Sequence, residues 1–252
     1  MTHWKARARA CGIHFGASLA VAALAALLVF GLWYPYPYRD ISGGRELFLL
    51  VVSVDVVIGP LITFSVFDRR KPRTELRRDL AVVALLQVCA LAYGLWTVAI
   101  ARPVHLVFEI DRLRVVHAVE VPDDLLGREP PQVDALPWTG PTLLAARPFR
   151  DSNESFQATM AALSGVQIGA RPDLWQPYAE AKPRVLQAAR PVSVLKARFA
   201  ARAAEIDRTA RAAGREADTL AWLPVVSRST FWTALIDPAS ADVVAFLPLD
   251  PY

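Results

Sequence analysis

One carboxylate stands inside an otherwise apolar stretch of this sequence. Asp55 is the only charged residue in 47–67, and Gly59 and Pro60 follow it within five positions. A carboxylate in a lipid-immersed helix is energetically costly, so it is normally turned toward a polar partner. Pro60 removes a backbone donor and crowds the carbonyl of Val56, which predicts a kink between Asp55 and Gly59.

Two polar residues in a later apolar stretch, 80–101, are candidate partners for Asp55. Counted from the outer ends of the stretches, Asp55 and Tyr93 lie at a similar depth, roughly 12 Å at about 1.5 Å per residue. Gln87 lies about 9 Å deeper and meets Asp55 only if the stretches are tilted or offset. We expect Asp55 to face this stretch, either protonated and hydrogen-bonded to Tyr93, or charged and open to another protein. An internal polar clamp and a partner-binding site both fit this pattern.

The elements that must position these residues are membrane spans. Of the 252 residues, 54% are hydrophobic, and the excess is concentrated in three runs at about 13–34, 47–67 and 80–101. About 20 apolar residues in a helix span the roughly 30 Å of a hydrocarbon core. Charges and prolines are frequent from residue 103 onward. We therefore expect an N-terminal transmembrane domain at 1–102 and a second domain at 103–252.

The placement of lysine and arginine predicts the orientation of these spans. The N-terminus is basic, and the loop between the first two spans carries only Arg39 and Arg45. The loop between the second and third spans is the most basic, with Arg69, Arg70, Lys71, Arg73, Arg77 and Arg78. Basic loops stay in the cytoplasm. We expect a cytoplasmic N-terminus and a domain at 103–252 outside the cytoplasm, which is the periplasm if the cell has two membranes; the resemblance described below implies the bacterial inner (cytoplasmic) membrane.

Net charge and composition argue against several function classes. The formal charge of +4 comes from the basic excess beside the spans, where it meets anionic lipid headgroups. The second domain is slightly acidic and has no basic-aromatic stripe. We therefore expect membrane lipids as partners and no nucleic acid.

The second domain shows no pattern of catalytic or metal-binding residues. The chain has two cysteines, Cys11 and Cys89, and neither cysteine nor histidine occurs at metal-site spacing. His105 and His117 fall on expected strands and are interpreted as sheet residues. We expect no catalytic residue, no metal and no cofactor. The alternative function is a small membrane enzyme or transporter subunit that uses Asp55.

Short periodic segments predict an α+β fold for the second domain, with an antiparallel sheet of five strands. The predicted helices end at glycine or are interrupted by proline. The expected elements are a hairpin at 104–110 and 113–121, helices at 152–163 and 193–213, a proline-broken helical segment at 173–189, and strands at 220–226, 231–236 and 243–249.

Two separate parts of the chain resemble a known family. The membrane half contains Arg45-Glu46-Leu47, Asp55, Gly59-Pro60-Leu61, Lys71, Asp79-Leu80, Gln87 and Tyr93-Gly94. The second domain begins with RPVHLVFEIDRLRVV and ends with LAWLPVV and WTALIDPASADVVAFLPLDPY. These segments resemble the type IV pilin accessory proteins of the TfpX/TfpZ type. The resemblance does not extend to about 122–190.

The resemblance implies an inner-membrane accessory protein, a chaperone or adaptor, that assists pilin-specific assembly and surface display of type IV pili. The implied partners are the type IV pilin subunit (the major pilin) and other pilus assembly proteins. We expect the second span, with Asp55, Gly59 and Pro60, to contact the transmembrane helix of the pilin. The periplasmic domain would contact the pilin head.

Overall fold

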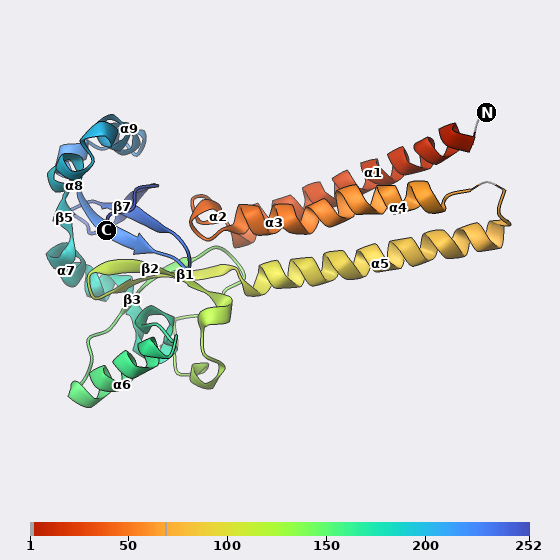
Figure 1. Ribbon diagram of the computed structural model, residues 1–252. Coiled ribbons are helices and arrows are strands. Elements are labelled where there is room, and N and C mark those ends of the chain that lie inside the picture. The colour runs from red at the N-terminus through yellow and green to blue at the C-terminus, as the bar shows by residue number, and fades with distance from the viewer. Residues whose placement is uncertain (1–2, 69) are drawn as a thin grey trace. The chain divides into compact units, whose positions relative to one another are not determined.

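The computed structural model describes residues 3–68 and 70–252 (Figure 1). The chain divides into two compact units. The first comprises the residues up to Arg39 together with Gly43–Ala101. The second comprises Asp40–Ser42 together with Arg102–Tyr252.

The first unit is helical, and its described part contains three helical stretches that are long and apolar enough to cross a membrane. This confirms the predicted three-span class. The stretches are Trp4–Trp33, Gly44–Val66 and Arg73–Ile100. The first stretch comprises α1 (His3–Leu28) and the π-helical η1 (Val29–Trp33). The second comprises α3 (Gly44–Ser53), η2 (Val54–Ile58) and α4 (Gly59–Val66), and the third is α5 (Arg73–Ile100). A short helix, α2 (Tyr38–Ile41), precedes α3.

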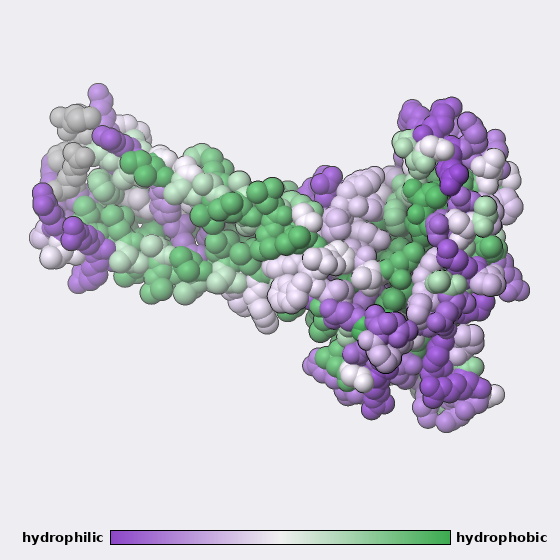
Figure 2. All heavy atoms as spheres, turned by 180° about the vertical axis from the view of Figure 1, so that it is seen from behind, coloured by the Kyte–Doolittle hydropathy of each residue, from purple (hydrophilic) through white to green (hydrophobic). Residues whose placement is uncertain are grey.

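Each stretch is longer than its apolar run, because the helices continue into their basic flanks. The second stretch packs against both of the others. A small core forms where Val29, Tyr34, Phe48 and Val98 are buried, and the Tyr34 hydroxyl donates to the backbone oxygen of Val98 at 3.2 Å. The outer surface of these helices is predominantly apolar (Figure 2), as expected for side chains that face lipid.

The second unit is built on a mixed sheet of eight strands, all within residues that the structure describes. The strand order is β4-β3-β1-β2-β6-β7-β8, with β5 paired to β6. The strands are β1 (Pro103–Glu109), β2 (Arg112–His117), β3 (Thr142–Ala146), β4 (Trp175–Pro177), β5 (Arg190–Pro191), β6 (Ala221–Val226), β7 (Phe231–Ile236) and β8 (Val243–Leu247).

The predicted α+β class is confirmed, but the sheet is not purely antiparallel and has more than five strands. β3 runs parallel to β1, and β2 runs parallel to β6. Both parallel pairs join strands that are far apart in sequence. Parallel neighbours need a crossover connection, and local alternation carries no information about such pairings. β3, β4 and β5 were not predicted because they lie outside the clearly periodic segments.

Four α-helices and several 3₁₀ turns complete the second unit. The helices are α6 (Ser152–Leu163), α7 (Tyr178–Ala188), α8 (Val192–Arg198) and α9 (Ala203–Ala212). The 3₁₀ turns are η3 (Ala118–Glu120), η4 (Asp123–Leu125), η5 (Ile168–Ala170), η6 (Pro172–Leu174), η7 (Ala200–Arg202) and η8 (Ala217–Thr219). One core cluster joins α8 and α9 to β6, β7 and β8, and another lies around β1, β2 and β3.

Locally encoded elements match the prediction, whereas two helical segments differ from it. The β1–β2 hairpin, α6 and the last three strands lie where the sequence places them. The predicted helix at 193–213 is instead two helices, because Phe199 leaves the helical region with φ −116° and ψ 53°. Phe199 there packs against the core under α8 and α9. Pro183 lies inside α7 and does not break it.

Candidate functional site

The second apolar stretch changes helix type where the sequence predicts a kink. η2 (Val54–Ile58) is π-helical, whereas α3 and α4 on either side are α-helical. In a π-helix each carbonyl pairs with the N–H five residues further on, so the carbonyl of Asp55 would pair with the nitrogen of Pro60. Because proline has no N–H, this carbonyl needs a donor from elsewhere.

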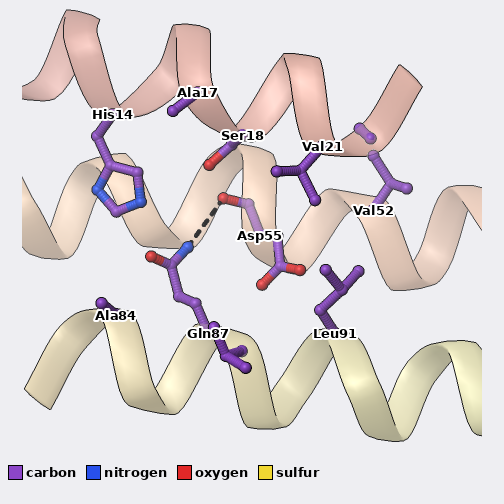
Figure 3. Close-up of a pocket in the computed structure, with 11 residues that line it drawn as sticks. His14, Ala17, Ser18, Val21, Val52, Asp55, Ala84, Gln87 and Leu91 are labelled. Atoms are coloured by element: carbon purple, nitrogen blue, oxygen red, sulfur yellow. Dashed lines mark hydrogen bonds between the residues drawn. The ribbon is translucent and has the colours of Figure 1, made fainter. Parts of the chain in front are cut away.

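Gln87 of α5 supplies that donor. Its Nε2 donates to the backbone oxygen of Asp55 at 3.2 Å (Figure 3). Gly59 makes the approach possible, because a Cβ at this position would lie only 1.8 Å from Gln87 Nε2. The structure thus brings together four of the predicted site residues, Asp55, Gly59, Pro60 and Gln87, around one backbone carbonyl.

Of the two states expected for Asp55, the one with a hydrogen bond to Tyr93 is not formed in this structure. In the described part of the chain no hydrogen bond links the two side chains, and Tyr93 is 68% exposed. The depths differ from those expected because the second span starts earlier, at Gly44. Measured from Gly44 and Ile100 at about 1.5 Å per residue, Asp55 lies within about 3 Å of the depth of Gln87 but about 6 Å deeper than Tyr93.

The carboxylate of Asp55 points into a cleft between the helical stretches (Figure 3). The cleft has a volume of about 190 Å³ and a mostly apolar lining, with His14, Ser18 and Gln87 as its other polar side chains. Asp55 Oδ1 is buried and has no hydrogen-bond partner among the described residues. A buried oxygen of this kind is costly, and it is the atom of this site that most needs a donor.

A polar contact of the first span was not predicted from the sequence. His14 Nδ1 and Thr63 Oγ1 are hydrogen-bonded at 2.5 Å, which joins α1 to α4. Ser18, one turn along α1, is only 8% exposed. The spacing of His14 and Ser18 by four residues puts both on one helix face, and this was the signal that could have identified α1 as part of the site.

The basic loop is partly ion-paired. Lys71 Nζ lies 2.7 Å from Asp79 Oδ2 and 3.5 Å from Glu75 Oε1. Arg7 Nε donates to the backbone oxygen of Phe67 at 2.9 Å, so the start of α1 lies beside the end of α4. The predicted topology residues Arg70, Lys71, Arg73, Arg77 and Arg78 are in or next to this loop, and Arg69 lies outside the described residues.

The two histidines of the second unit are structural parts of the sheet. Burial lowers the pKa of His105 to about 4, so its ring is neutral. Nε2 donates to the backbone oxygen of Ala135 at 3.0 Å, and Nδ1 accepts from the hydroxyl of Thr142 at 2.6 Å. His117 Nδ1 contacts Glu120 Oε2 at 2.9 Å. Among residues 3–68 and 70–252, no three His, Cys, Asp or Glu side chains are grouped to hold a metal ion.

Comparison with curated proteins finds relatives that span almost the whole chain. The chain is 35% identical to "Fimbrial assembly protein, serogroup I" of Dichelobacter nodosus over 232 residues, which are 91% of this chain and 90% of the relative. This chain belongs to the fimbrial assembly protein family. Membership confirms the resemblance to a type IV pilus accessory family.

Further members of the fimbrial assembly protein family match different shares of this chain. The serogroup E1 protein of Dichelobacter nodosus is 33% identical over 91% of this chain and 90% of its own length. The protein of serogroups C1 and C2 is 43% identical over 43% of this chain and 83% of its own length. The family model "Fimbrial assembly protein FimB" matches residues 2–43. No solved structure is detectably similar to this chain.

Proposed function

We propose that this protein is an inner-membrane accessory protein, an adaptor or chaperone, that assists assembly and surface display of type IV pili by binding the pilin subunit. The alignment with fimbrial assembly proteins over nine tenths of the chain is the main support. The three helices of spanning length support a membrane location. We propose other pilus assembly proteins as further partners.

The proposed orientation follows the distribution of basic residues. The N-terminal flank and the loop at 68–79 would lie in the cytoplasm, because short basic loops are retained there. The second unit would then lie in the periplasm, where a pilin head is accessible. A reporter fused after Tyr252 that is active only in the periplasm tests this orientation, and activity of a cytoplasm-specific reporter would contradict it.

Within the membrane, we propose that Asp55 is the recognition group for a client helix. The bundle uses the backbone carbonyl of Asp55 for its own packing, since Gln87 donates to it. The carboxylate is not used in this way, and its Oδ1 stays buried beside a cleft. A client helix that brings a hydroxyl, amide or ammonium group into the cleft would supply the missing donor.

Two weak contacts suit an assembly helper better than one strong contact. The membrane cleft would bind the client helix, and the second unit would bind the client head. Linking the contacts raises the effective concentration of the second one, so each can stay reversible. A helper must release its client into the growing pilus, which a single tight contact would prevent.

The second candidate function is a small membrane enzyme or transporter subunit. It is favoured by the convergence of His14, Ser18, Asp55 and Gln87 on one cleft. A transport path needs polar groups along the whole membrane thickness, and these four residues are concentrated around one level. We therefore place this candidate below the adaptor.

Deletion of the gene and counting of surface pili test the proposed function. The count is repeated in a strain that cannot retract its pili. Loss of pili in both strains would indicate a role in assembly, and recovery in the second strain would indicate a role in the balance with retraction. Normal pili in the deletion strain would contradict the proposal.

A photocrosslinking amino acid tests the proposed contact with the pilin helix. Leu91 lines the Asp55 cleft, whereas Leu85 on the same helix is 64% exposed and is not in its lining. We expect a pilin adduct from position 91 that exceeds the adduct from position 85. Equal adducts from both positions, or none, would contradict recognition at the cleft while leaving the pilus count as an independent test.

A further inference from the structure

The cleft beside Asp55 contains more free hydrogen-bond acceptors than free donors. Gln87 already donates from Nε2 to the backbone oxygen of Asp55, and its Oε1 accepts no hydrogen bond within the described part of the chain. Oδ1 of Asp55 is buried and also has no partner among the described residues. His14 is hydrogen-bonded to Thr63 through Nδ1, and Ser18 adds a single hydroxyl. A group that fills the cleft must therefore bring donors.

The cleft also carries one acidic group without a strong base beside it. Its described lining residues include no lysine and no arginine. No hydrogen bond joins the His14 ring to the Asp55 carboxylate within residues 3–68 and 70–252. An ionised carboxylate inside lipid is normally paired with a cation, and a charge-assisted hydrogen bond is roughly twice as strong as a neutral one. The charge of the cleft therefore favours a cationic partner.

A primary ammonium group matches these acceptors better than the other donor groups do. A hydroxyl brings one donor together with two lone pairs, and a side-chain amide brings a carbonyl oxygen along with its two donors. Those lone pairs would face the acceptors of Asp55 and Gln87. A guanidinium brings five donors, more than the two side chains can accept. An ammonium has three donors and no lone pair, so it can bond to both side chains at once.

The rest of the cleft suits an aliphatic stem. Its volume of about 190 Å³ is more than ten times the roughly 10–15 Å³ that one water molecule needs. Val21, Val52 and Leu91 are among the apolar residues that line it (Figure 3). Methylene groups attached to the ammonium would lie against these walls, as they do wherever a long amine buries its stem and keeps its charge paired.

The depth of Asp55 favours an ammonium carried by a protein helix over one carried by a lipid headgroup. The second stretch begins at Gly44, so Asp55 lies about 17 Å along the helix at about 1.5 Å per residue. That is near the middle of a hydrocarbon core about 30 Å thick. A lipid headgroup would have to leave the interface to reach this level, whereas a neighbouring helix already passes through it.

We propose that the Asp55 cleft binds a primary alkylammonium group of the client helix. The nitrogen donates to the carboxylate of Asp55 and to Oε1 of Gln87, and the alkyl stem lies against Val52 and Leu91. This inference rests on the proposed role of Asp55 in recognising a client helix, and it specifies the chemistry of the group that the client brings.

Ligand-dependent stability of the full chain in nanodiscs tests the proposal without any pilin. The nanodiscs contain phosphatidylglycerol and phosphatidylcholine, neither of which has an ammonium N–H. The probes are n-hexylammonium, 1-hexanol and hexanamide at equal concentration. Asp55→Asn removes the charge and keeps the shape of the side chain. Glu46→Gln is the matched control, because Glu46 is an acidic residue of the same stretch that does not line the cleft.

We expect n-hexylammonium to raise the Tm of the wild-type protein and of Glu46→Gln by about 2–4 °C more than the two neutral probes do. Asp55→Asn should lose this difference. Equal effects of all three probes on the wild-type protein would overturn the assignment of an ammonium ligand. A response of Asp55→Asn as large as that of the wild-type protein would overturn the assignment of the site.

Exchange of phosphatidylcholine for phosphatidylethanolamine distinguishes the two sources of an ammonium group. We expect this exchange to shift the Tm of the wild-type protein and of Asp55→Asn equally. A rise in the wild-type protein alone would overturn the client helix as the source, because a lipid amine would then fill the cleft. These measurements need no pilus, so their failure leaves the pilus count in the deletion strain as a separate test of the proposed function.

Discussion

The side-chain amide of Gln87 is hydrogen-bonded to the backbone oxygen of Asp55 at 3.2 Å, within the five π-helical residues of the second span. This contact satisfies the carbonyl that Pro60 leaves without a donor. It also means that the bundle is stabilised by the main chain of Asp55, whereas the carboxylate is free to serve another purpose. Stability and recognition at this residue can therefore be separated by mutation.

Replacement of Gly59 by alanine should destabilise the bundle. The new Cβ would lie 1.8 Å from Gln87 Nε2, so Gln87 must move and the Asp55 carbonyl loses its donor. We expect a loss of about 1–3 kcal/mol in the free energy of unfolding. Thermal unfolding of the full chain in detergent measures it.

A matched glycine and a double variant make this test specific. Gly12→Ala should leave the Tm unchanged or raise it slightly, because a Cβ there meets nothing within 4 Å and alanine is the better helix former. Adding Gln87→Ala to Gly59→Ala should recover part of the loss, since the clash disappears. A Gly59→Ala variant as stable as the Gly12→Ala variant would show that the two helices are not in close contact here.

Replacement of Asp55 by alanine should reduce surface pili without reducing stability. Alanine keeps the backbone carbonyl that Gln87 uses and removes an oxygen that is buried without a partner. We expect the free energy of unfolding to stay constant or rise by about 1 kcal/mol. Immunoblots of the membrane fraction and pilus counts measure the two effects, and unchanged pilus number at normal protein level would rule out a role for the carboxylate.

Stability should fall on mild acidification because of His105. Burial lowers the pKa of this imidazole from 6.5 to about 4. Between these values the unfolded chain binds a proton that the folded chain does not, so the free energy of unfolding decreases as the pH falls from 6.5 toward 4. The full effect is at most about 3 kcal/mol. His105→Gln should flatten the dependence of Tm on pH in this window, and an identical slope would refute the assignment.

Replacement of Ile110 by glycine should stabilise the protein. Ile110 has φ +54° in the turn between β1 and β2 and is 66% exposed, so a β-branched residue occupies a conformation that favours glycine. The expected gain is about 0.5–1 kcal/mol after the greater chain entropy of glycine is subtracted. Ile110→Val retains the strain and should give no gain in urea unfolding, which makes it the control.

The sequence predicts those parts of the fold that local patterns encode. Alternation placed the β1–β2 hairpin and the last three strands, and Gly214, with φ +71°, ends the helical region as expected. The parallel pairing of β3 with β1 was missed because it depends on a crossover through the loop that contains Trp138. The interruption at Phe199 was missed because tertiary packing of the phenyl ring outweighs local helix propensity.

The candidate site was predicted in its residue types more than in its contacts. Asp55, Gly59, Pro60 and Gln87 were identified because a polar or helix-breaking residue is unusual in an apolar span. The contact with Tyr93, one of the two alternatives for Asp55, is not formed because the rotation and ends of a span are set by packing against its neighbours. His14 was overlooked because a single histidine near a basic N-terminus resembles an ordinary flank.

The π-helical segment also determines which faces the second span offers to its neighbours. Successive residues of a regular α-helix are rotated by about 100° around its axis. The wider π-helical turn at Val54–Ile58 therefore changes the directions in which the side chains after it point, compared with an uninterrupted α-helix. Asp55 accordingly meets α5, while Thr63 meets α1 through His14. Removing one residue from this segment would rotate the second half of the span around the helix axis and separate Thr63 from His14. The length of the π-helical segment therefore matters more than the identity of its valines.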